Sequence, residues 1–360
     1  MHKFSLGRLD LSILLPAILI VLLALSAFYS IDTQIFRSQL IFLVGSLFAY
    51  VFFLNIDYHV FAFHSKAIYC LMVASLMVLF LIGIEARGAV RWIDIFGLRF
   101  QFSEIIKPFF IVFIAQYLAR DESRSIAKFG MSFIMLLPIF FLTLKQPDLG
   151  NAMIYLITLV FMLFIYGFPA RYFVALFALV AAPLPIIFSM LHDYQKLRLM
   201  TFFNPAADPF GSSYNAVQSL ISIGSGGIFG RGFGQATQSI LKFLPERHTD
   251  FIFATISESL GFFGGIVLLA LYAYLLSRIY IVANSVNESF SRMMIMGFYF
   301  LFLTHIFLNI GMNIGVVPIV GVTLPFASYG GSSLLTSFIM LGMISAARFD
   351  SRRHGGLEIS

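Results

Sequence analysis

Apolar runs long enough to cross a lipid bilayer recur along this chain of 360 residues, and they constrain its fold more than any other feature. A helix needs about 20 mostly apolar residues to cross the hydrocarbon core, where it satisfies its own backbone hydrogen bonds. Ten such helices are predicted, at residues 11–29, 40–54, 67–84, 104–118, 129–144, 151–167, 171–190, 251–277, 293–312 and 329–347. The predicted fold class is an all-α integral membrane protein, with residues 1–360 forming a single polytopic domain.

The composition agrees with this fold class. Hydrophobic residues make up 60% of the chain and charged residues only 11%, whereas soluble domains carry about 25% charged residues. Soluble, disordered and fibrous classes are therefore excluded. The formal net charge is +6, but no water-exposed basic domain is predicted, so nucleic acid is not an expected partner. The single cysteine, Cys70, lies in an apolar run and cannot form an intrachain disulfide.

Lysine and arginine are unequally divided between the two sides of the predicted bundle. If the N-terminus is cytoplasmic, the loops and termini on that side hold twelve of them, whereas the short loops on the other side hold only Arg37 and Lys145. The positive-inside rule therefore predicts that both termini are cytoplasmic.

Two outer segments break this rule. Residues 85–103, with the start of the next helix, and residues 192–250 contain nine cations: Arg87, Arg91, Arg99, Lys107, Lys196, Arg198, Arg231, Lys242 and Arg247. They predict an extracytoplasmic site for a phosphate or pyrophosphate, which Arg and Lys bind well. The alternative is that long loops are translocated whatever their charge.

The large outer loop, residues 192–250, lies between the seventh and eighth predicted helices and is far longer than the usual connection of about 2 to 8 residues. Its apolar content argues against disorder, and residues 214–223 are predicted to form an amphipathic helix at the membrane interface. Residues 224–234 contain six glycines, which allow close backbone approach to a ligand beside Arg231. Alternatively, these glycines permit tight packing of the loop. No Gly-Lys-Ser/Thr follows, so a nucleotide site is not predicted.

Five ionisable residues lie at the outer ends of predicted helices. Glu104 and Lys107 are three residues apart and share a helix face. Asp250 comes just before a helix, and Glu258 lies about two turns deeper in it. Asp148 stands in the turn between the fifth and sixth helices. Because charges near a membrane core are costly and commonly functional, these residues predict an outer cavity containing carboxylates and cations.

Each of these residues also has a structural interpretation. Asp148 and Asp250 could be helix N-caps, and Glu104 and Lys107 could form a structural ion pair. Glu258 could hydrogen-bond a neighbouring helix.

Polar residues form a stripe along the ninth predicted helix. His305, Asn309 and Asn313 recur at four-residue spacing, which indicates hydrogen bonding between helices. No His, Cys or carboxylate spacing matches a known metal motif, so a metal site is left unknown.

Seven segments resemble the SEDS family (shape, elongation, division and sporulation) and occur in that family's order. They are residues 88–92 (GAVRW), 102–107 (FSEIIK), 146–150 (QPDLG), 208–209 (DP), 224–227 (GSGG), 244–253 (LPERHTDFIF) and 328–332 (SYGGS). The short termini and the Pro-Glu-Arg-His-Thr-Asp form resemble the RodA branch more than the FtsW branch.

The resemblance implies a ten-helix peptidoglycan glycosyltransferase of the bacterial cell membrane that polymerises lipid II, a disaccharide-pentapeptide on undecaprenyl pyrophosphate. The family's essential aspartate maps onto Asp250, its important tryptophan onto Trp92, and its conserved Glu and Lys onto Glu104 and Lys107. The resemblance also implies a class B penicillin-binding protein as transpeptidase partner and a divalent cation, Mg or Mn, that assists activity.

The expected reaction inverts the anomeric carbon in one displacement, for which one base suffices. Asp250 is the expected base, and Lys107, Arg91, Arg198 or Arg231 are expected to stabilise the leaving pyrophosphate. Trp92 could stack on a sugar or anchor its loop in the interface. Asp148 and Glu258 are expected to contribute to substrate binding. The alternative functions are a flippase for the lipid-linked precursor and a non-catalytic scaffold for a penicillin-binding protein.

Overall fold

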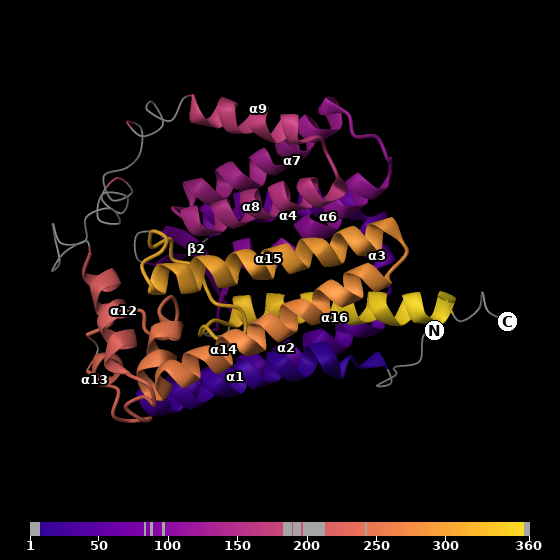
Figure 1. Ribbon diagram of the computed structural model, residues 1–360. Helices are drawn as coiled ribbons and strands as arrows, with labels where there is room; N and C mark the ends of the chain where they lie inside the picture. The colour runs from indigo at the N-terminus through magenta and orange to yellow at the C-terminus, as the bar shows by residue number, and fades with distance from the viewer. Residues whose placement is uncertain are drawn as a thin grey trace.

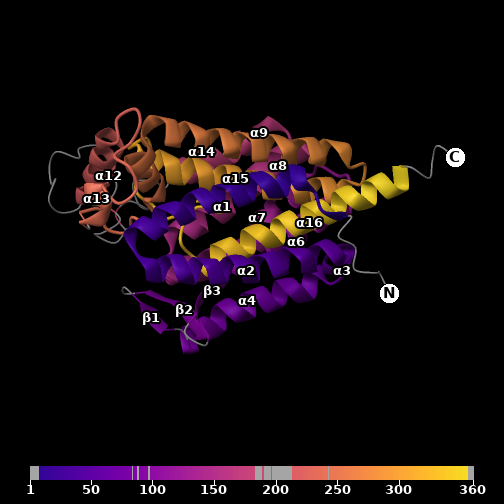
Figure 2. The same ribbon diagram turned by 90° about the horizontal axis from the view of Figure 1, so that it is seen from below.

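The computed structural model describes residues 8–82, 84–86, 89–95, 98–182, 189, 196, 213–241 and 243–355. Long helices run side by side in one bundle, and the start of α1 (Leu11–Ile31) and the end of α16 (Gly331–Gly355), the helices next to the two termini, lie at the same end of it (Figure 1). The opposite end carries α12 (Tyr214–Ser225), α13 (Thr237–Ile240) and a small antiparallel sheet, as a second view also shows (Figure 2). The amphipathic helix predicted at residues 214–223 is thus confirmed as α12.

The remaining helices overlap the predicted spans, but a helix at residues 59–63 was not predicted, and the helices at 33–55, 252–285 and 331–355 extend seven or eight residues beyond their predicted bounds. The remaining helices are α1 (Leu11–Ile31), α2 (Thr33–Asn55), α3 (His59–Phe63), α4 (Ser65–Ile82), α5 (Phe102–Ile105), α6 (Lys107–Ala119), α7 (Ile126–Lys145), α8 (Leu149–Tyr166), α9 (Ala170–Ala181), α14 (Ile252–Ser285), α15 (Ser289–Asn313) and α16 (Gly331–Gly355). Eight helices, with α5 and α6 taken as one, are long and apolar enough to cross a membrane, counted over the described residues. The membrane fold class is confirmed. The count of ten stays a prediction, because α4 and α9 are shorter where described.

Local sequence signals set the ends of α8. The Asp148 side chain accepts a hydrogen bond from the Asn151 backbone N–H at 3.2 Å, which confirms the predicted N-cap. The helix ends at Gly167, whose φ of 91° is the left-handed conformation that favours glycine at a helix C-terminus.

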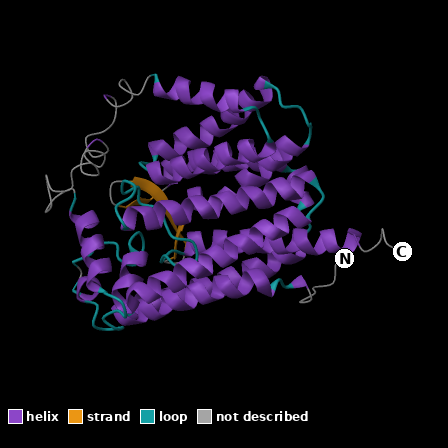
Figure 3. Ribbon diagram, viewed as in Figure 1, coloured by secondary structure: helices purple, strands orange, loops and turns teal. Residues whose placement is uncertain are grey.

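The smaller outer segment, expected as a loop over residues 85–103, contains a sheet instead (Figure 3). Strands β1 (Ile84–Ala86), β2 (Ala89–Ile95) and β3 (Leu98–Gln101) pair antiparallel in that order. The β2 sequence is rich in β-branched and aromatic residues, which favour strands. Trp92 of β2 lies directly opposite Gln101 of β3, so the sheet holds these two residues side by side.

The core of the bundle is built around α15 and α16, the most buried of the eight spans. Helix α15 packs against α6, α8 and α14, and α16 packs against α2. The outer faces of α2 and α7 expose large apolar side chains such as Phe48 and Phe141. This pattern is expected where lipid rather than water covers the surface.

Helix α14 is broken near its start, and the glycine-rich segment fills the break. Gly261 has a φ of 68° inside the helix. The backbone N–H groups of Arg231 and Gly232 donate to the carbonyls of Glu258 and Ser259, at 3.0 and 2.9 Å. In return, the N–H of Phe262 donates to the Gly227 carbonyl at 2.9 Å.

Backbone groups that a helix break releases at membrane depth must find partners in the protein, and the glycine-rich segment supplies them. A Cβ on Gly226 or Gly230 would stand 2.2 Å from a carbonyl oxygen of α14. The glycines therefore permit backbone-to-backbone packing, the structural alternative raised by the sequence.

Replacing Gly230 with Ala should destabilise the protein by about 2 kcal/mol or more, because its φ is 82° and the new Cβ would meet Ser259 O. Gly224→Ala is the matched control, since nothing lies within 4 Å of a Cβ there. Melting of the purified variants in detergent measures the effect. Equal melting temperatures would contradict the packing role.

At the end that holds the termini, His59 ties α3 to the start of α15. Its Nε2 lies 3.0 Å from Glu288 Oε1, and its Nδ1 lies 2.8 Å from Asp57 Oδ1. The hydrogen bond to Glu288 is the main cause that raises the pKa of His59 from 6.5 to about 9. The imidazolium is therefore charged at neutral pH, and both of its N–H groups donate to carboxylates.

This contact should make stability depend on pH above neutrality. A raised pKa in the folded protein gives stability that is fully present below pH 6.5 and is lost as the pH rises through 9. His59→Gln should therefore melt below the wild type at pH 6, and the difference should vanish by about pH 10. Melting curves across this range test the expectation, which a pH-independent difference would refute.

Candidate functional site

A cavity of about 630 Å³ opens at the end of the bundle opposite the termini. Its walls come from β2 and β3, α5, the turn before α8, the start of α12, the segment before α14, the segment after α15 and the start of α16. The described lining residues are Trp92, Gln101, Glu104, Pro147, Asp148, Leu149, Asn151, Asn215, Glu246, Thr249, Asp250, Phe251, Ile319, Val320, Gly321, Thr323, Tyr329, Gly330, Ser332 and Ser333. Segments distant in sequence thus converge on one site.

Asp250 lies in the cavity wall just before α14, and α15 holds its backbone. The side-chain amides of Asn309 and Asn313 donate to the Asp250 carbonyl at 2.9 and 3.0 Å. Asn313 Oδ1 also accepts from the Ala254 N–H at 3.1 Å in the first turn of α14. The polar stripe therefore joins helices, as the sequence predicted, and it fixes where Asp250 stands.

The segment that carries Asp250 is held from a second side by the loop before α16. The His248 carbonyl accepts from the Tyr329 N–H at 2.7 Å, and the Thr249 carbonyl accepts from Ser328 Oγ at 2.6 Å. Burial lowers the pKa of the neighbouring Arg247 guanidinium from its ordinary value. The chain leading to Asp250 is therefore fixed to the loop before α16 through the carbonyls of His248 and Thr249.

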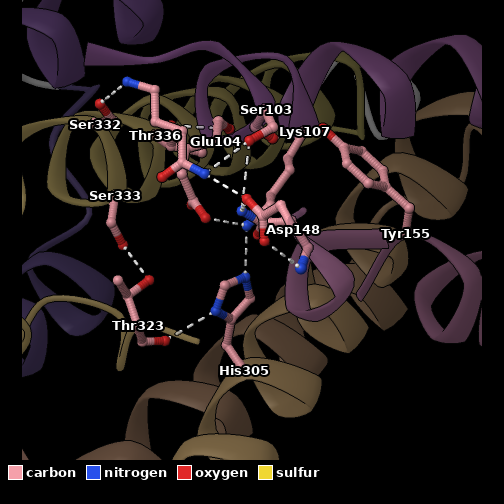
Figure 4. Close-up of polar contacts among 12 residues, drawn as sticks. Ser103, Glu104, Lys107, Asp148, Tyr155, His305, Thr323, Ser332, Ser333 and Thr336 are labelled. Atoms are coloured by element: carbon pink, nitrogen blue, oxygen red, sulfur yellow. Dashed lines mark hydrogen bonds and ion pairs between the residues drawn. The ribbon is translucent and has the colours of Figure 1, made fainter. Parts of the chain in front are cut away.

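Lys107 and Glu104 form the ion pair that their spacing predicted. Lys107 Nζ lies 2.7 Å from Glu104 Oε1 and 3.0 Å from His305 Nε2 (Figure 4). His305 Nδ1 lies 2.9 Å from the Thr323 carbonyl, so the proton on Nδ1 donates there and Nε2 accepts from Lys107. The Lys107 side chain is 0% exposed. Its charge therefore sits beneath the cavity, whereas Glu104 reaches the wall.

Asp148 accepts several hydrogen bonds in the cavity wall. Its Oδ2 accepts from Gln101 Nε2 at 2.5 Å and from Asn151 Nδ2 at 2.9 Å, in addition to the N-cap bond on Oδ1. Gln101 is in turn fixed to α16, because Ser332 Oγ accepts its backbone N–H at 2.7 Å. Asp148 is thus both a helix cap and a carboxylate of the site.

The other predicted site residues are spread more widely. Trp92 lines the cavity. Glu258 is fully buried away from it and accepts hydrogen bonds from the Gln238 and Ser239 backbone N–H groups at 2.8 and 3.0 Å, which ties α13 to α14. Arg231 is exposed beside the glycine-rich segment, where its Nε donates to Ser225 O. The Arg91 side chain and all of Arg198 lie outside the described residues.

The described lining is acidic. Glu104, Asp148, Glu246 and Asp250 line the cavity, and no Lys or Arg does so among the residues described. Sequence reasoning missed Gln101, Asn151 and Glu246. Glu246 stands inside the segment 244–253, Gln101 directly precedes 102–107 and Asn151 directly follows 146–150, but no local pattern showed that these residues share a cavity.

The described residues do not fit a resident divalent cation. Over those residues, no group of three or more His, Cys, Asp or Glu side chains lies close enough to hold a metal. The lone pairs of Asp148 are directed at amides, and Glu104 is engaged by Lys107. No chemical step is therefore assigned to a metal.

Comparisons with known proteins give one consistent result. The model of the FtsW, RodA and SpoVE family, described as cell cycle protein, matches residues 6–353. The peptidoglycan glycosyltransferase MrdB of Escherichia coli K12 is 39% identical over 279 residues, 77% of this chain and 75% of its own. The stage V sporulation protein E of Bacillus subtilis is 33% identical over 329 residues, 89% of each chain.

Solved structures show the same likeness. A chain from a study of how a peptidoglycan synthase complex coordinates polymerization and crosslinking superposes with a TM-score of 0.84 at 26% identity, covering 98% of this chain and 99% of that one. The rod shape determining protein RodA of Thermus thermophilus superposes with a TM-score of 0.71 at 27% identity, covering 95% and 97%.

The buried ion pair can be tested by a double-mutant cycle. Lys107→Met should lower stability by about 3–5 kcal/mol, because it leaves the Glu104 carboxylate without its buried counter-charge. The double variant Glu104→Gln/Lys107→Met should recover most of the loss. Melting of the purified variants in detergent provides the comparison. If the double variant melts at as low a temperature as Lys107→Met, the loss of stability does not come from leaving Glu104 without its counter-charge.

Proposed function

This chain belongs to the SEDS family, the FtsW, RodA and SpoVE proteins, and from that premise we propose that it polymerises lipid II with Asp250 as general base. Its curated relatives are named peptidoglycan glycosyltransferases, so glycosyltransferase activity is the established part. The substrate, the base and the mechanism are the proposal.

The observation that carries the proposal is the position of Asp250. It is half-buried in the wall of the one described cavity that also contains Trp92, Glu104 and Asp148. Its backbone carbonyl accepts hydrogen bonds from Asn309 and Asn313, which fix its place in the wall. A base must be held within hydrogen-bond reach of the proton that it removes, and a fixed position in the cavity wall supports this assignment.

The reaction forms one bond and breaks one bond. The 4-hydroxyl of the acceptor N-acetylglucosamine attacks the anomeric carbon of the donor, and Asp250 takes the hydroxyl proton. Undecaprenyl pyrophosphate departs with the electrons of the broken bond. Trp92 stacks on a sugar ring in the cavity, beside Gln101 on the neighbouring strand.

Positive charge for the leaving pyrophosphate is proposed to come from Lys107 beneath the cavity and from Arg91 and Arg198. Lys107 acts from its fixed place against Glu104 as a buried charge. Arg231 and Glu258 are assigned a structural role instead. Their contacts lie where α12, α13 and the glycine-rich segment pack on α14.

The cavity is proposed to face outward in the bacterial cell membrane. The chain is a multi-pass membrane protein, and both termini lie at the end opposite the cavity (Figure 1). If the positive-inside rule places the termini in the cytoplasm, the cavity is extracytoplasmic, where lipid II is consumed. A class B penicillin-binding protein is the proposed partner, in line with the synthase complex whose chain superposes on this one.

Asp250→Asn should lower the rate of lipid II polymerisation by about 10² to 10⁴-fold, because an amide cannot accept the proton. Its melting temperature should stay close to that of the wild type, since Asn309 and Asn313 bind the backbone of residue 250. Polymer formed by the purified protein in lipid vesicles, with and without a class B penicillin-binding protein, is the measurement.

Asp148→Asn is the matched control. It also removes a carboxylate from the cavity wall, and Asn keeps the N-cap of α8. Its NH2 group cannot accept the hydrogen bonds that Asp148 Oδ2 takes from Gln101 and Asn151, so the melting temperature of this variant is measured as well. Polymerisation by Asp250→Asn at near wild-type rate would remove the assigned base. Equal losses in both variants would show that the cavity needs negative charge and not a base at residue 250.

A further inference from the structure

A second pocket, of about 300 Å³, lies at the end of the bundle that holds the termini, between the start of α1 and the last turns of α16. Its lining includes three arginines, Arg8, Arg348 and Arg352, and one carboxylate, Asp10. That carboxylate is already committed, because it accepts hydrogen bonds from Arg348 Nη1 and from the Ser12 backbone and hydroxyl. The remaining charge of the pocket is positive.

Two of the three guanidinium groups of this pocket, those of Arg348 and Arg8, are held in place. Arg348 Nη1 also donates to Ser12 Oγ at 3.1 Å, and its side chain is only 16% exposed. The Arg8 guanidinium carbon lies 4.7 Å from the ring centroid of Phe349, a cation–π arrangement. Planar guanidinium groups fixed in this way suit the oxygens of a phosphate.

An apolar stripe leads away from the pocket along α1. Leu11 lines the pocket, and the exposed face of α1 continues through Leu15, Leu19 and Leu22, at the three- and four-residue spacing of one helix face. Leu11 is 67% exposed and Leu15 is 56% exposed. Hydrocarbon chains running parallel to α1 would cover this stripe.

We propose that this pocket binds the phosphate headgroup of an anionic glycerophospholipid, whose acyl chains lie on the leucine stripe of α1. The pocket stands at the polar end of two membrane-crossing helices, the depth at which headgroups lie. Basic pockets between helices at a membrane surface are suited to anionic headgroups. Neither the charge nor the stripe alone selects this ligand, but a phosphate joined to acyl chains satisfies both.

Lipid binding to the full chain in detergent, measured by native mass spectrometry, tests the proposal. The probes are dioleoyl phosphatidylglycerol and dioleoyl phosphatidylethanolamine, which share acyl chains and differ in net charge. The wild type should prefer phosphatidylglycerol. Arg8→Gln/Arg352→Gln should lower phosphatidylglycerol affinity by about 25-fold, because each cation near a membrane surface is worth about fivefold, and should leave phosphatidylethanolamine binding unchanged.

Matched variants distinguish lipid binding in this pocket from general electrostatic attraction to cations elsewhere on the protein. Lys66→Gln/Arg120→Gln removes two exposed cations outside this pocket and should keep wild-type phosphatidylglycerol affinity. Arg352→Gln alone changes an exposed side chain, so it should fold and still lose about fivefold. An equal loss in both double variants, or no loss in Arg352→Gln, would overturn the proposal.

The source of the phosphate is tested separately. Inorganic phosphate at millimolar concentration should not displace phosphatidylglycerol, because it lacks the chains that contact the stripe. Complete displacement would show a simple anion site and would overturn the lipid assignment. These outcomes do not depend on polymerisation, so failure of the lipid site and failure of the proposed enzyme mechanism are distinguishable.

Discussion

The Asp250 carbonyl accepts hydrogen bonds from two side-chain amides of α15, and the geometry of the cavity depends on this contact. Asn309 and Asn313 are fully buried, and a buried amide is costly unless its hydrogen bonds are made. Pairing them with the Asp250 carbonyl, two residues before α14, fixes that helix start against α15. Asn313 accepts from Ala254 as well, so the first turn of α14 cannot shift without breaking a second bond.

The requirement that a buried polar group have a partner also explains two other features of the bundle. At Gly261 the helix break of α14 releases backbone groups, and the glycine-rich segment pairs with them. Beneath the cavity Lys107 is paired with Glu104 and with a neutral His305. In both places a polar group is tolerated in an apolar bundle because a partner is fixed opposite it. The outer loop is therefore attached through its backbone, and α5 and α6 are attached to α15 through a charge.

Local patterns predicted much of this structure. Apolar runs predicted the helices. The position of Asp148 in a turn just before a helix predicted its N-cap, and the three-residue spacing predicted the Glu104–Lys107 ion pair. The sheet was not predicted, because strands of three, seven and four residues are too short for a periodicity to stand out in a segment expected as a loop. The contacts of Glu258 with residues 238 and 239 join distant segments, and no local pattern encodes such pairing. For the same reason, Gln101 and Glu246 could be placed in the cavity only by the tertiary fold.

The charges of the cavity are arranged unevenly, and this gives a substrate a preferred orientation. On the side of α5, α6 and α8, the Glu104 charge is offset by Lys107, and the Asp148 charge is spread over amide donors from two residues. Glu246 and Asp250 belong to the segment before α14, where Thr249 Oγ1 donates to Glu246 at 3.0 Å. A diphosphate is attracted toward the side that holds the buried Lys107 charge. We therefore expect the leaving group against α5 and α6, with the acceptor hydroxyl at Asp250.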